Sequence, residues 1–227
     1  ASPERSAVAL ARRRALGQAR GVRLYHTTTS PFVRKVLVAA HELGLADRIE
    51  TVFLRPVPTS ADPTLSRANP LNKIPALELD DGSALYDSHV ICEYLDAIRP
   101  DASKPGILPA AGPERFRVLR QEALCDGILD AAILVFYERA SRPKELWWPA
   151  WLEGQSEKAR QGVDALAAEV GDFGERVDLG TISAAITLGW LEFRAPLGPL
   201  REGRERLFAW YDAFRERPSM RATEPKL

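Results

Sequence analysis

The pattern of hydrophobic positions in the first half of the chain predicts strands that alternate with helices. Residues 22–25 alternate as a short strand does, and the apolar positions after Pro31 recur at helical spacing as far as Leu43. Ser30 is a good N-cap for this helix, and proline suits its first position. Residues 49–54 predict a second strand. This part of the chain is therefore expected to form a β-α-β unit.

A hairpin and another helix are expected after a proline-rich connection over residues 56–70. Residues 75–79 and 83–86 are short alternating runs on either side of an Asp-Asp-Gly turn, which is a strong hairpin signal. Asp87 and Ser88 then suit the start of a helix. The expected apolar face of that helix consists of Val90, Ile91, Tyr94 and Leu95.

The strand pattern disappears from Gly112 onward, and long helical segments replace it. Asp178 is the expected N-cap of the third segment, with Thr181 at the N3 position. The second half of the chain is therefore expected to be an all-helical domain. The four segments run over residues 114–140, 151–168, 181–193 and 201–216.

The composition of residues 1–21 differs from that of the remaining chain. This stretch is rich in Ala and Arg, and Glu4 is its only acidic residue. Its apolar run is too short for a secretory signal, which leaves an upstream extension, the favoured interpretation, or an organelle-targeting peptide. The rest is expected to divide into an α/β domain over residues 22–100, a linker over 101–111 and a helical domain over 112–227.

Charge and composition exclude several classes of protein. Thirty-one Lys and Arg balance thirty-one Asp and Glu among 227 residues, which argues against an electrostatic nucleic-acid binder. The longest apolar run, residues 131–137, is far shorter than the ~20 residues of a membrane-spanning helix. The cysteines Cys92 and Cys125 lie far apart, and the three histidines are dispersed, so neither a disulfide scaffold nor a metal site is expected. We therefore expect a cytoplasmic protein.

Three local features carry candidate chemistry. Ser30 follows a strand and a polar turn and begins a helix, whose free N–H groups and dipole can stabilise an anion. The Ile74–Pro75 step is a plausible cis peptide that would leave the backbone of Ile74 open to a peptide-like ligand. Asp87 and Ser88 at the next helix start can hold an amino-acid head group. Taken singly, Ser30 and the Asp87-Ser88 pair are more simply explained as helix caps.

The order and spacing of these features resemble soluble glutathione transferases, most closely bacterial members of the serine type. The resemblance spans residues 22–225. Its motifs are L-Y-H-T-T-T-S-P-F-V-R-K-V, N-P-L-N-K-I-P-A-L, D-D-G-S-A-L-Y-D-S-H-V-I-C-E-Y-L and R-P-S-M-R-A-T-E-P. It implies a thioredoxin-like N-terminal domain that holds glutathione and an all-α domain that supplies a pocket for the electrophile.

Carried over residue by residue, the resemblance assigns a catalytic role to Ser30, whose hydroxyl would hydrogen-bond the sulfur of glutathione. A one-residue shift would give this contact to Thr29, and Tyr25 ranks third because tyrosine-type relatives activate the sulfur near the end of this strand. Pro75 matches the cis-proline of the fold. The implied glutathione-binding residues are Phe32, Lys73, Ile74, Pro75, Asp87 and Ser88.

The resemblance implies an enzyme that activates the glutathione thiolate for attack on a small hydrophobic electrophile, as a homodimer, with glutathione as co-substrate and no other cofactor. Trp147 and Trp148 are candidates for lining an apolar substrate cleft. The turn before Pro31 lacks cysteine, which argues against cysteine-type relatives that reduce mixed disulfides. Two alternatives stay open: other glutathione-dependent chemistry (dehalogenation, peroxide reduction or isomerisation), and a non-catalytic interaction module with the same fold.

Overall fold

The computed structural model describes residues 22–226. These residues group into two compact units, which are described separately. The N-terminal unit contains residues 22–108 together with residues 225–226, and the helical unit contains residues 109–224. The expected extension over residues 1–21 lies outside the described residues.

The β-α-β unit forms as the hydrophobic pattern predicts. Strand β1 (Val22–His26) leads into helix α2 (Pro31–Glu42), and strand β2 (Ile49–Phe53) pairs with β1 in parallel. Ser30 caps α2, since its side chain accepts a hydrogen bond from the backbone N–H of Val33. The helix thus begins where the serine and proline indicate.

The proline-rich connection contains a helix that the hydrophobic pattern did not predict. Helix α3 spans Pro63–Ala68. Asp62 caps it by accepting hydrogen bonds from the N–H groups of Thr64 and Leu65 at 2.8 and 3.0 Å. The prolines were interpreted only as a connection between elements, but an Asp-Pro step is also a helix start, because proline loses no hydrogen bond in the first turn.

Strands β3 (Ala76–Glu78) and β4 (Ala84–Leu85) form the predicted hairpin, and helix α4 (Ser88–Ile98) follows. Among residues 22–108 the four strands make one sheet in the order β2-β1-β3-β4, with β3 antiparallel to both of its neighbours. The predicted face of α4 was wrong at one position. Val90 is 41% exposed, whereas Cys92 is fully buried, so the apolar stripe is rotated toward the cysteine.

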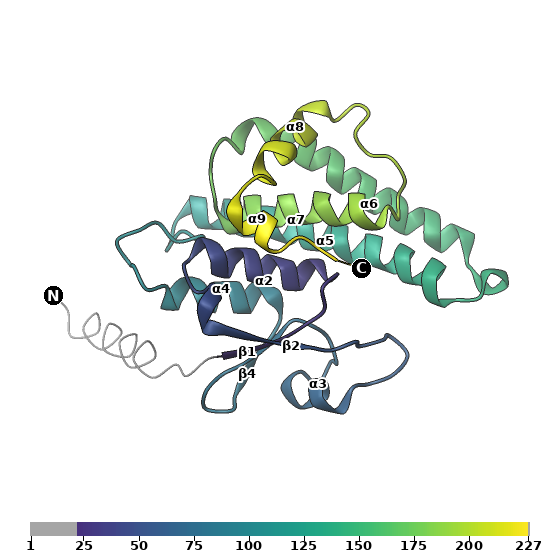
Figure 1. Ribbon diagram of the computed structural model, residues 1–227. Coiled ribbons are helices and arrows are strands. Elements are labelled where there is room, and N and C mark those ends of the chain that lie inside the picture. Colours follow the sequence, from purple (N-terminus) through teal and green to yellow (C-terminus); the bar gives the residue numbers. More distant parts are fainter. Residues whose placement is uncertain (1–21, 227) are drawn as a thin grey trace. The chain divides into compact units, whose positions relative to one another are not determined.

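The sheet of the N-terminal unit is covered on both faces. Tyr25 and Ala76 pack with Leu65 and Ala68 of α3 in one hydrophobic cluster. Neighbouring side chains along a strand point to opposite faces, and the buried Leu24 therefore faces away from this cluster. Helices α2 and α4 pack against each other on that second face (Figure 1).

The helical unit is built around three long helices. Helix α5 (Pro113–Ser141) packs against both α6 (Pro149–Glu169) and α7 (Leu179–Arg194). Helices α8 (Glu205–Phe214) and α9 (Pro218–Ala222) follow, the second of which was not predicted. The hydrophobic periodicity therefore placed the long helices correctly and missed the short C-terminal one.

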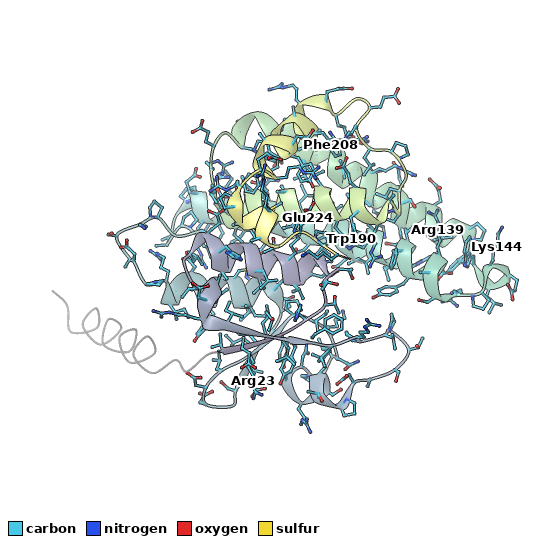
Figure 2. The ribbon with its side chains drawn as sticks, in the orientation of Figure 1. Arg23, Arg139, Lys144, Trp190, Phe208 and Glu224 are labelled. Atoms are coloured by element: carbon cyan, nitrogen blue, oxygen red, sulfur yellow. The ribbon has the colours of Figure 1, made fainter. Side chains whose placement is uncertain are left out.

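Two local features define the packing of the helical unit. A Cβ atom on Gly162 of α6 would clash with the side chain of Ile128 of α5, so glycine permits the close approach of these helices. Asp178 and Thr181 form a reciprocal capping box at the start of α7, as their positions predicted. Trp190 and Phe208 are buried in this unit (Figure 2).

Candidate functional site

The pairing of the strands gathers the candidate residues at one edge of the sheet. Tyr25 near the end of β1 lies opposite Ala76 at the start of β3. Leu85 at the end of β4 lies opposite Leu77 of β3. The segments that follow β1, precede β3 and follow β4 therefore meet at the same edge. These segments are residues 27–30, 74–75 and 87–88.

The hydroxyl of Ser30 lies at the positive end of a 12-residue helix. Its Oγ accepts a 3.3 Å hydrogen bond from the N–H of Val33. A hydroxyl has one donor and two acceptor positions, so this cap leaves the proton of Ser30 available to a ligand. Ser30 is half-buried, which combines access for a ligand with partial exclusion of water. The position suits stabilisation of an anion.

The neighbouring threonines differ in their contacts. Thr28 is exposed, and its hydroxyl donates a 2.8 Å hydrogen bond to the backbone carbonyl of Lys226, which ties the turn to the C-terminal segment of the same unit. The hydroxyl of Thr29 forms no hydrogen bond within the described residues. Thr29 therefore remains the alternative donor to Ser30.

Tyr25 is held in a different environment from Ser30. Its side chain is 5% exposed in the cluster beneath α3, and its hydroxyl donates a 2.6 Å hydrogen bond to Oε2 of Glu78. Glu78 also forms an ion pair with Arg23, which is labelled in Figure 2. The hydrogen bond to Glu78 and burial together raise the pKa of Tyr25. A phenol hydroxyl has one proton, so a phenol that donates it to a carboxylate has none left to donate to a ligand anion.

Two aromatic residues lie beside the Ser30 turn. Partial burial holds the pKa of His26 below its usual value, so this imidazole is neutral at neutral pH. Its ring packs edge-on against Phe53 with 5.7 Å between the ring centroids. Phe32 is half-buried in the first turn of α2, and Nζ of Lys35 lies 6.0 Å from the centroid of its ring. Because His26 is neutral, it adds no positive charge beside the Ser30 turn, whereas the N-terminus of α2 supplies positive potential there.

The loop before β3 contains backbone groups without a hydrogen-bond partner among the described residues. The peptide bond between Ile74 and Pro75 is cis, as its setting suggested. Within the described residues, neither the N–H nor the carbonyl of Ile74 forms a hydrogen bond. The Ile74 side chain packs against the Tyr25 cluster, which fixes its backbone in place, and Lys73 is exposed. An extended peptide can pair with such a free backbone segment.

Asp87 and Ser88 form the start of α4. Asp87 is exposed and accepts a 3.1 Å hydrogen bond from the N–H of His89 through Oδ1, whereas Ser88 is 2% exposed. The peptide bond before Asp87 is cis. A carboxylate at the start of a helix, where N–H groups and the positive end of the helix dipole are also found, offers partners for both charges of an amino-acid head group.

Sequence reasoning missed two residues that organise this edge. The side chains of Asn69 and Asn72 hold the loop that carries Lys73 and Ile74. The chain contains two asparagines, and both lie in this loop, a signal that was available in the sequence.

The tryptophan candidates belong to the helical unit. In the helical unit, Trp148 is 64% exposed and stacks on Trp151, while Nε1 of Trp147 donates a 3.0 Å hydrogen bond to the carbonyl of Arg142. Among residues 22–226, no group of three or more His, Cys, Asp or Glu side chains is placed to hold a metal ion, and no helix is long and apolar enough to span a membrane.

Two family models match this chain. Residues 29–98 match the N-terminal domain of glutathione S-transferases, and residues 149–213 match their C-terminal domain. The first match contains Ser30, the Ile74-Pro75 step and the Asp87-Ser88 helix start. The chain is also 32% identical over 207 residues to the uncharacterized GST-like protein YibF of Escherichia coli (strain K12), covering 90% of this chain and 98% of that protein.

Solved structures show the same fold. A glutathione transferase family member from Pseudomonas fluorescens Pf-5 with bound glutathione is 42% identical, with a TM-score of 0.87, over 91% of this chain and 100% of that chain. A glutathione S-transferase from Methylobacterium radiotolerans in complex with glutathione sulfonate is 35% identical, with a TM-score of 0.80, over 91% of this chain and 95% of that chain.

Proposed function

The chain belongs to the glutathione S-transferase family, and on that premise we propose that it is a serine-type glutathione transferase. Its substrates are glutathione and a small hydrophobic electrophile. The observation that carries the proposal is the meeting of three complementary groups at one edge of the sheet. These groups are the Ser30 hydroxyl, the free backbone of Ile74 and the Asp87-Ser88 helix start.

Each part of glutathione has a partner of matching chemistry in this proposal. The ammonium of the γ-glutamyl group pairs with the carboxylate of Asp87, and its carboxylate binds Ser88 and the N–H groups that start α4. The cysteinyl part pairs its amide with the backbone of Ile74, as an added strand does. Lys73, which is exposed, reaches the glycyl end.

Ser30 then acts on the sulfur. A free thiol has a pKa near ~8.5 and is mostly protonated at neutral pH, but the thiolate is the nucleophile. The Ser30 O–H donates to the sulfur and the N-terminus of α2 adds positive potential, so both favour the thiolate and lower the thiol pKa. The thiol proton passes to solvent. The thiolate forms a carbon–sulfur bond with the electrophile, and the leaving group departs with its bonding electrons.

In this proposal Tyr25 has no direct contact with the sulfur. Its hydroxyl is bonded to Glu78, and its raised pKa opposes any role as an anion. Thr29 is the alternative donor, because its hydroxyl forms no hydrogen bond among the described residues. We further propose that the enzyme works in the cytoplasm as a homodimer in detoxification, on the strength of the family resemblance.

The experiment that tests this function measures the glutathione-dependent modification of an activated aryl chloride. The expected result is stoichiometric conjugate and chloride at a rate proportional to enzyme. S-Methylglutathione, which has no free thiol, is the matched control and should inhibit without reacting. If no conjugate forms but a peroxide is reduced at the expense of glutathione, transferase activity would be contradicted and glutathione-dependent peroxide reduction favoured. No glutathione-dependent reaction of either kind would contradict an enzymatic function.

A further inference from the structure

The loop between α3 and β3 is held by a network of asparagine side chains. This loop, residues 69–75, ends in the Lys73-Ile74-Pro75 segment that the proposed function assigns to glutathione. Asn69 is 2% exposed, and Asn72 is half-buried. The chain contains no asparagine elsewhere. An amide side chain both donates and accepts hydrogen bonds, whereas an ionised Asp carboxylate only accepts them.

Asn69 closes the loop on itself. Its Oδ1 accepts a 3.0 Å hydrogen bond from the N–H of Leu71, and its Nδ2 donates a 2.8 Å hydrogen bond to the carbonyl of Lys73. Its backbone carbonyl accepts the N–H of Asn72 at 2.8 Å. The carbonyl of Lys73 is thus occupied, and the next residue, Ile74, is the first with both backbone groups open.

Asn72 ties the closed loop to the rest of the unit. Its Oδ1 accepts hydrogen bonds from the N–H of Asp62 at 2.9 Å and from Oγ of Ser66 at 3.3 Å, and its Nδ2 lies 3.4 Å from the carbonyl of Ser60. Its backbone is left-handed, with φ of +53°. Asparagine tolerates this conformation better than most residues with a side chain. One residue therefore fixes both the turn and its anchorage to α3.

We propose that Asn72 is a positioning residue for glutathione: its side chain holds the loop in the conformation in which Lys73 and Ile74 meet the peptide. The inference rests on the proposed function and deepens it. Asn72 does not contact the ligand in this proposal, but it pre-organises the Lys73-Ile74 segment that does. The loop in its anchored form already presents the Ile74 backbone, so binding costs little ordering.

The effect of losing the anchor follows from population arithmetic. If the loop adopts its binding conformation for only a fraction of the time, the apparent Kd for glutathione rises by the inverse of that fraction. Loss of the Asn72 side chain removes its hydrogen bonds to Asp62, Ser66 and Ser60. A competent fraction of about one tenth gives a tenfold weaker Kd, equivalent to ~1.4 kcal/mol, which is within the net value of such bonds. Once glutathione is bound the loop is ordered again, so kcat at saturating glutathione is unchanged.

The test compares three variants with the wild type. Asn72→Gly removes the side chain but keeps the left-handed backbone accessible, and Asn72→Asp keeps the accepting oxygen as a milder change. Asp81→Ala is the matched control. Asp81 accepts hydrogen bonds from the N–H and hydroxyl of Ser83 in the β3–β4 turn, at the end of the hairpin remote from Pro75 and Asp87. Each variant is measured for glutathione Kd by calorimetry, for KM and kcat, and for Tm.

The expected result is a Kd and a KM for glutathione that rise about tenfold in Asn72→Gly and less in Asn72→Asp, with kcat unchanged. Asp81→Ala should lower Tm without changing Kd. An Asn72→Gly protein with lowered Tm and wild-type Kd would overturn the inference, because the side chain would then serve stability alone. A fall in kcat at saturating glutathione would overturn it as well. Those outcomes leave the proposed function intact. A wild type that binds no glutathione would overturn both the proposed function and the role of Asn72.

Discussion

Replacement of Ser30 by alanine separates two functions that one hydroxyl performs. Its Oγ accepts the N–H of Val33 as the cap of α2, and its proton is proposed to stabilise the glutathione thiolate. Ser30→Ala removes both interactions. Ser30→Thr keeps a hydroxyl of the same capping class and is the matched control.

The size of each effect can be estimated from the geometry. A hydrogen bond to a charged group contributes about 1.5–3 kcal/mol, and one pKa unit corresponds to about 1.36 kcal/mol. The pKa of bound glutathione should therefore rise by about 1–2 units in Ser30→Ala, toward the ~8.5 of a free thiol. The dipole of α2 remains and limits the rise. Loss of the cap costs ~1 kcal/mol or less of unfolding free energy, since the 3.3 Å bond is long.

The assay titrates the ultraviolet absorbance of the enzyme-bound thiolate, with Tm and the calorimetric Kd as companion readouts. Below the thiol pKa, turnover should fall about 10- to 100-fold in Ser30→Ala, in step with the thiolate fraction, while the Kd for glutathione stays close to the wild-type value. Ser30→Thr should retain a lowered thiol pKa. An unchanged thiol pKa in Ser30→Ala, together with a raised one in Thr29→Ala, would refute the assignment of the donor to Ser30.

Two further substitutions test other parts of the structure. Tyr25→Phe removes the donor to Glu78 and should lower the unfolding free energy by about 1.5–3 kcal/mol at neutral pH without changing the thiol pKa; a raised thiol pKa would make Tyr25 the donor. The same bond lowers the pKa of Glu78 in the folded state, so the stability that it contributes is present above the usual carboxyl pKa and is lost as pH falls through the lowered value. The unfolding free energies of the wild type and Tyr25→Phe should therefore converge at acidic pH. Asp178→Ala removes the cap of α7 and the 2.9 Å hydrogen bond from the N–H of Thr181, and should lower the unfolding free energy measured in urea by about 1–2 kcal/mol. A urea midpoint equal to that of the wild type would contradict the role of the capping box.

Local signals in the sequence predicted the parts of the site that depend on neighbouring residues. A capping serine before a proline determines where α2 begins, and the Asp-Gly turn determines the hairpin, so both could be recognised without tertiary information. The cis peptide before Pro75 was also suggested by its setting between a loop and a hairpin. The family resemblance then named residues that single motifs could not distinguish from ordinary caps.

Contacts between distant residues could not be predicted in the same way. The bond between Tyr25 and Glu78 joins residues on different strands and depends on the β1–β3 register. The hydrogen bond between Asn72 and Asp62 depends on helix α3, which was not predicted because its prolines were interpreted as part of a connection. Val90 was placed on the buried face of α4 because apolar residues at helical spacing are usually buried. In the folded unit, packing buries Cys92 instead.

The central claim, that this edge of the sheet binds glutathione, is tested most directly by calorimetry on the wild type and on the Asp87→Ala/Ser88→Ala double variant. The account predicts saturable binding of glutathione by the wild type and its loss in the double variant, with the fold of the variant verified by circular dichroism. Binding that survives in a folded double variant would contradict the assignment of the γ-glutamyl subsite. A wild type that binds no glutathione would contradict the function itself.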